Sequence, residues 1–162
     1  MRKIVVGFSK PKGFFNPLSW IIRFMYWTPY SHVYCSHVSE KYQQTLIYQA
    51  SGVQVNFMSK LQFDKRATVI SEFEFEISDE AFDSYMSWAI EQSGSPYSKT
   101  KLFEILFMDD LDKSDEPQWV CSVLIARVCK DFISHEDEKL SMDYATPKDI
   151  FDFCAFKGRR LS

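Results

Sequence analysis

The chain is poor in several residue types and patterns whose abundance would identify its class of protein. Its 162 residues include only five glycines and six prolines, which excludes collagen-like or linker-dominated sequence. Basic residues are not in excess, because 19 Lys and Arg stand against 22 Asp and Glu. This balance argues against nucleic acid as a partner. Length and ordinary charge content predict one domain over residues 1–162.

Long apolar runs are also missing. Nowhere do about 18 apolar residues follow one another, so no transmembrane segment is expected. The apolar run near the N-terminus is short and is followed by Lys10 and Lys12, unlike a secretory signal. A cytoplasmic location is therefore expected.

Cysteine is sparse and widely spaced. The four cysteines form no C-x-x-C pair, and no Cys/His cluster has the spacing of a zinc site. A chain of this size does not need disulfides for stability. We expect free thiols, no metal and no cofactor, with Cys35, Cys121, Cys129 and Cys154 available for packing or chemistry.

Aromatic residues are abundant instead, with 15 Phe, 8 Tyr and 4 Trp in the chain. That many rings will fill a core, and some of them should line a groove or an interface. Residues 14–30 are especially aromatic. They are consistent with contact to a lipid surface or, as we prefer, with a helix packed on a sheet.

Hydrophobic periodicity predicts strands in the first half of the chain and helices in the second. Strands are expected over 4–8, 31–38, 45–50, 53–57 and 68–77. Helices are expected over 18–27, from 78 to the Gly94 stop, over 102–107 and 119–132, and from Thr146 onward. The acidic stretch 109–117 is expected to be a solvated loop. This order predicts an α+β fold with an antiparallel sheet.

The strand over 68–77 has the clearest alternation. Its expected core face carries Val69, Ser71, Phe73, Phe75 and Ile77.

Cys121 is the first candidate for chemistry. It lies near the expected start of a helix, where the helix dipole and backbone N–H groups favour a thiolate. The same N–H groups can stabilise an oxyanion on a substrate carbonyl. Cys121 also falls on the apolar stripe of that helix, so a small core residue is the alternative interpretation.

A nucleophilic cysteine needs a base, usually a histidine held by a third polar group. His135 lies in an acidic stretch and is expected to be solvated. His32 and His37 lie five residues apart on one expected strand, so they face opposite sides of the sheet. At most one of them faces the Cys121 helix, and each could be an ordinary strand histidine.

Gln49 interrupts an otherwise apolar strand. Its amide oxygen could accept a ring N–H of a histidine and fix the tautomer, as an asparagine does in some cysteine proteases. The alternative is a glutamine that fills a gap or lies at a sheet edge.

Six segments occur in the order found in one family. They are Leu18–Phe24, Thr28–Val33, Tyr48–Val53, Gly94–Ser98, Trp119–Ala126 and Thr146–Ile150. In this order and in these residues the chain resembles the circularly permuted branch of the NlpC-type papain-like cysteine peptidases and amidases. Relatives of that branch include the lecithin:retinol acyltransferase-like enzymes. The resemblance implies a permuted papain-like fold, with a small antiparallel sheet packed against helices.

Carried over residue by residue, the resemblance makes Cys121 the nucleophile, His32 the general base and Gln49 the orienting group. The family's histidine begins its strand after a serine, which selects His32 over His37. Two departures stand out. Many permuted relatives have a glutamate where Gln49 stands, and many have Cys-Ser-Glu where this chain has Cys121-Ser122-Val123.

The resemblance implies hydrolysis of an amide bond in a peptide or peptidoglycan-like substrate through a thioester, without metal or cofactor. Two alternatives remain, a hydrolase or transferase acting on lipid acyl groups and an inactive binding domain. Four aromatic residues in or beside the family-like segments are candidates to bind substrate: Trp27, Tyr30, Tyr97 and Trp119.

Overall fold

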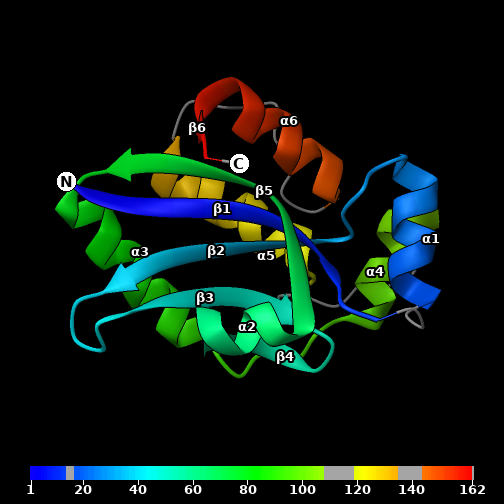
Figure 1. Ribbon diagram of the computed structural model, residues 1–162, viewed down its shortest axis with the longest axis horizontal. Coiled ribbons are helices and arrows are strands. Elements are labelled where there is room, and N and C mark those ends of the chain that lie inside the picture. Colours follow the sequence, from blue (N-terminus) through cyan, green and yellow to red (C-terminus); the bar gives the residue numbers. More distant parts are fainter. Residues whose placement is uncertain (14–16, 108–118, 135–143, 162) are drawn as a thin grey trace.

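The computed structural model describes residues 1–13, 17–107, 119–134 and 144–161. A six-stranded antiparallel sheet crosses the molecule in the order β4-β3-β2-β1-β5-β6 (Figure 1). The strands are β1 (Arg2–Pro11), β2 (His32–Ser39), β3 (Gln44–Ser51), β4 (Gln54–Ser59), β5 (Ala67–Ile77) and β6 (Arg159–Arg160).

Helices cover both faces of this sheet and one of its ends. They are α1 (Pro17–Tyr26), α2 (Lys60–Arg66), α3 (Asp79–Gln92), α4 (Lys99–Phe107), α5 (Cys121–Val128), a π-helical turn η1 (Cys129–Ile133) and α6 (Pro147–Lys157). In Figure 1, α3 and α5 lie behind the sheet, α6 lies above it, α2 lies in front, and α1 and α4 lie beside its right-hand end. The predicted α+β class is confirmed.

Two of the helix starts show why these residues fold locally as they do. The Ser78 hydroxyl caps α3 by accepting the N–H of Ala81 at 3.1 Å. Thr146 and Asp149 form a capping box at the start of α6, and Pro147 occupies the first turn.

The main core lies between the sheet and the layer of α3, α5 and α6. Strand β1 contributes Ile4, Val6 and Phe8 to it, one residue in every two, as a strand with one face in a core requires. A smaller apolar cluster under α2 covers the opposite face and consists of Tyr34, Ile47 and Phe63. Alternate residues of β2 therefore serve two different environments.

A β-bulge in β5 places part of this strand on a different face from the one expected. Phe73, Phe75 and Ile77 enter the main core as predicted. The register against β1 shifts between Phe8 and Ser9, so Ile70 is an extra residue and the alternation reverses there. Ile70 consequently packs against the main core, whereas Val69 packs against the cluster under α2. The expected placement of Val69 was wrong.

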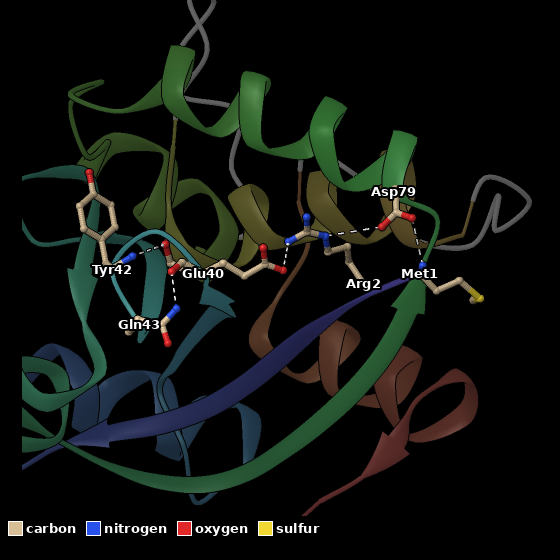
Figure 2. Close-up of polar contacts among 7 residues, drawn as sticks. Met1, Arg2, Glu40, Tyr42, Gln43 and Asp79 are labelled. Atoms are coloured by element: carbon tan, nitrogen blue, oxygen red, sulfur yellow. Dashed lines mark hydrogen bonds and ion pairs between the residues drawn. The ribbon is translucent and has the colours of Figure 1, made fainter.

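Exposed charges join the first residues of β1 to two neighbouring segments (Figure 2). The amino group of Met1 and the Arg2 guanidinium both contact Asp79, at 3.1 and 3.5 Å, and Arg2 also lies 2.9 Å from Glu40. Exposed pairs of this kind contribute about 1 kcal/mol or less each. They hold one end of the sheet, and the site described below lies at the other end of β1.

Two further observations concern the described part of the chain as a whole. None of its helices combines the length and the apolar character needed to cross a membrane. All four cysteines are buried and free. The predicted loop over 109–117 and the predicted solvated His135 lie outside the described residues.

Candidate active site

A cavity of about 580 Å³ lies where β1 ends and β2 begins. Its walls include the side chains of His32, Gln49 and Cys121. These residues come from β2, β3 and the first turn of α5. The structure therefore brings the three predicted catalytic residues to one cavity.

His32 and Gln49 are joined by a hydrogen bond of 2.7 Å between Nε2 and Oε1. The antiparallel register of β2 and β3 ends at the pair Cys35 and Tyr48. Both His32 and Gln49 lie just beyond that pair, on the face opposite the main core. Their side chains thus connect the two strands at the point where the backbone pairing stops.

The sulfur of Met58 determines how the Gln49 amide is oriented. Gln49 donates from Nε2 to Met58 Sδ at 3.1 Å, so its oxygen is the atom directed at His32. An amide oxygen only accepts, and His32 must therefore carry its proton on Nε2. Nδ1 is left with a lone pair, which is the form of the ring that accepts a proton.

Cys121 is the first residue of α5, and Val120 before it supplies no side-chain cap. Backbone N–H groups of Val33, Ser122 and Cys121 itself lower the pKa of the thiol, but burial acts more strongly and raises it overall. The side chain is only 5% exposed. The helix start thus acts in the predicted direction, but burial has the larger effect on the pKa of the thiol.

The pKa of His32 is shifted in the direction opposite to that of Cys121. Burial lowers the pKa of His32, and the hydrogen bond that the ring donates to Gln49 only partly opposes this effect. A neutral imidazole and a protonated thiol are therefore the resting forms near neutral pH. Such a pair works by general-base catalysis, in which the proton moves as the sulfur attacks.

His37 faces the other side of the sheet, as its spacing from His32 predicts. Its ring packs edge-on against Phe57, Phe82 and Tyr85, with ring centroids 5.4 to 6.2 Å apart. Burial lowers its pKa to about 4. His37 is a core residue and is absent from the cavity wall.

The four aromatic candidates for substrate binding lie in different parts of the structure. Tyr97 lines the cavity. Tyr30 lies in the main core, where its ring stacks with Phe151 at 5.3 Å, and Trp119 packs edge-on against Trp88 at 5.7 Å. Trp27 follows the last residue of α1 and is 87% exposed. The structure thus brings only Tyr97 of the four to the cavity.

Other cavity residues escaped sequence reasoning. Met58, Phe63, Leu102 and Phe103 supply much of the apolar wall, and Arg66 and Lys99 supply its two cations. Phe63 and Arg66 lie on α2, a seven-residue helix too short to show a periodic pattern. A usable signal was present at Ser59, which caps α2 by accepting the N–H of Gln62 at 3.3 Å.

The wall is mostly apolar and also includes serines. The hydroxyls of Ser19 and Ser31 lie 2.6 Å apart. Among the described lining residues there is no carboxylate, whereas the whole chain carries a net charge of −3. Within the described ranges, no group of three or more His, Cys, Asp or Glu side chains is arranged to hold a metal ion.

No protein-family model matches the chain, and no curated protein matches it either. The likeness to the NlpC-type peptidases therefore depends on the residues and their order.

Proposed function

We propose that the chain is a papain-like cysteine hydrolase with Cys121 as nucleophile, His32 as general base and Gln49 as the group that orients His32. The observation that carries the proposal is the 2.7 Å hydrogen bond between His32 and Gln49 in the wall of the cavity that Cys121 also lines. It leaves Nδ1 of His32 free to accept a proton. A buried thiol of raised pKa needs such a base before it can react.

The proposed reaction has two stages. His32 takes the thiol proton while Cys121 Sγ bonds to the substrate carbonyl carbon, and the oxygen becomes negative. The backbone N–H of Cys121, at the start of α5, donates to that oxygen. His32 then returns the proton to the leaving amine nitrogen, the C–N bond breaks, and a thioester remains. Water attacks the thioester with His32 as base, which releases the acid and restores the thiol.

The substrate that we propose first is an amide in a peptide or peptidoglycan-like molecule, as the resemblance implies. One observation favours a second candidate, the ester of a lipid acyl chain. The cavity wall is largely apolar, with Leu18, Ile22, Phe63, Leu102 and Phe103 among its residues. An acyl chain would be stabilised there by about 0.8 kcal/mol for each buried methylene.

Acylation of Cys121 by a small activated ester tests the chemistry directly. Intact-mass and peptide mass spectrometry should find the adduct on Cys121, formed faster than on free cysteine at pH 7. Cys121→Ser and His32→Ala should lose that adduct, whereas His37→Phe, a histidine variant outside the cavity, should keep it. Acylation no faster than that of free cysteine would instead indicate a binding domain without catalysis.

The two substrate candidates are separated by incubating the protein with muropeptides and with phospholipid or other lipid esters. Release of amine from the first supports the amidase, and release of fatty acid from the second supports the acyl hydrolase. Cys121→Ser is the control in both assays.

A further inference from the structure

Helix α1 is apolar on the side that faces away from the protein. Ser19 and Ile22 are its buried residues, and Arg23 is its only charged one. Its outward face consists of Trp20, Ile21, Phe24, Met25 and the following Trp27, all of them exposed. We call this set the aromatic face. A helix that is apolar all round is ordinarily buried, so an exposed one calls for a partner.

The end of α1 holds Trp27 outward at an energetic cost. Its φ of 51° is in the left-handed region that favours glycine. The N–H of Thr28 donates to the carbonyl of Arg23 at 3.1 Å, which is the six-to-one bond of a Schellman helix end. Glycine is the usual residue at the position that Trp27 occupies. This conformation is sterically unfavourable for a residue with a side chain, and Trp27 adopts it while remaining 87% exposed.

Other residues of α1, which are not part of the aromatic face, line the cavity. Leu18 and Ile22 of α1 line the cavity together with Leu102 and Phe103 of α4. The two helices are joined by a hydrogen bond of 3.1 Å from Tyr26 to the carbonyl oxygen of Ile105, and Figure 1 shows them side by side at one end of the sheet. A surface that covers the aromatic face therefore lies beside the cavity.

The charged residues at the cavity indicate what kind of partner the aromatic face would contact. Arg66 and Lys99 are exposed and line the cavity, and the described lining contains no acidic residue. Among the described lining residues the net charge is thus positive, in a chain that is negative overall. Anionic head groups complement it, because each Lys or Arg near an anionic membrane surface strengthens binding to that surface.

We propose that the aromatic face docks the protein on a lipid bilayer that contains anionic phospholipid. Trp and Phe with Leu or Ile on one side of a helix are the residues that enter the boundary between head groups and acyl chains. Arg23, whose guanidinium lies 5.5 Å from the Trp20 ring centroid, can reach the phosphates while the rings enter deeper. The docked cavity faces the membrane surface.

Vesicle sedimentation with the full chain tests this docking without any catalytic readout. Wild type should bind vesicles of phosphatidylcholine and phosphatidylglycerol more tightly than vesicles of phosphatidylcholine alone. Phe24→Ser combined with Trp27→Ser should weaken binding about tenfold or more. Phe156→Ser is the matched control, because Phe156 is 84% exposed on α6 and lies outside the aromatic face.

A second set of variants tests the contribution of the two cations at the cavity. Arg66→Gln with Lys99→Gln should remove most of the preference for anionic vesicles, whereas Lys41→Gln on the β2–β3 connection should not. Cys121→Ser should bind vesicles as wild type does, so a failed hydrolase assay leaves this test intact. Circular dichroism of each variant establishes that it is folded.

Two results would overturn the proposal. One is wild type that fails to bind either kind of vesicle, or a double aromatic variant that binds equally well. The other is a concentration-dependent dimer in analytical ultracentrifugation that the double aromatic variant abolishes while vesicles remain unbound. The aromatic face would then be a contact between two copies of this chain.

Discussion

Met58 holds Gln49 in the orientation that His32 needs, through the 3.1 Å contact between Sδ and the amide nitrogen. A flipped amide would direct Nε2 at the ring and compete for the lone pair on the imidazole. The thioether is thus the part of the site that distinguishes the two ends of a nearly symmetric amide. In the proposed mechanism, the base His32 therefore depends on a residue outside the proposed catalytic residues.

Met58→Leu should lower kcat/KM about fivefold to tenfold and leave the free energy of unfolding almost unchanged. Leucine keeps the volume but removes the acceptor, so the Gln49 amide gains a second orientation. Hydrolysis kinetics and urea unfolding measure the two effects. In Met58→Leu the pH dependence of kcat/KM should also shift. If Met58 had only a structural role, the substitution would change the free energy of unfolding and leave that pH dependence unchanged.

The pH dependence of Cys121 alkylation should show a neutral resting pair. Because burial lowers the pKa of His32 and raises that of Cys121, the rate with iodoacetamide should keep rising from pH 5 to pH 9. A plateau below pH 6 would indicate a preformed thiolate and imidazolium, contrary to this expectation.

Gln49→Glu should move that rising limb to lower pH. A carboxylate beside the ring stabilises imidazolium, so the pKa of His32 rises and the thiol loses its proton more readily. The same substitution introduces the acid that many members of the permuted family have at the corresponding position, the family that the sequence resembles. Rates measured over the same pH range test the shift, and Gln54→Glu at the exposed start of β4 is the control.

His37 should make the fold sensitive to acid. Its pKa is about 4 in the folded protein, below its ordinary value of 6.5, so the unfolded chain binds the proton more readily. Its stabilising contribution is complete above pH 6.5 and is lost as the pH falls toward 4. The linked loss is up to about 3 kcal/mol.

His37→Phe should remove that part of the pH dependence because phenylalanine cannot be protonated. Urea unfolding at pH 4, 5, 6 and 7 measures it. If the wild type and the variant lose stability in parallel, protonation of His37 is not the cause.

Trp27→Gly should stabilise the folded protein by about 1 kcal/mol, because glycine adopts the left-handed conformation without steric cost. Thermal unfolding measures the gain. A second variant, Trp27→Ala, keeps the steric cost without the ring and should not be stabilised. If glycine and alanine behave alike, the backbone at this helix end is not strained.

Much of the site followed from local patterns in the sequence. The strand periodicity placed His32 and His37 on opposite faces, and the break before Cys121 placed it at a helix start. The polar interruption at Gln49 was visible in the same way. These features depend on a few neighbouring residues, which is why one sequence sufficed to predict them.

Features that depend on tertiary packing escaped prediction. The bulge at Ile70 results from how β5 pairs with β1, and it reversed the face of Val69. The degree of burial at Cys121 comes from segments far away in sequence, and it reversed the expected direction of the thiol pKa. Tyr30 and Trp119 were candidates for a groove because they adjoin family-like motifs, but their rings complete the core.

The order of the three proposed catalytic residues has a consequence for how the protein is made. His32 and Gln49 are 17 residues apart, on adjacent strands that a short connection joins. The ribosome adds Cys121 a further 72 residues after Gln49. The proposed base and its partner are therefore synthesised long before the proposed nucleophile. The nascent chain carries no complete reactive centre until α5 has emerged and packed on β2 and β3.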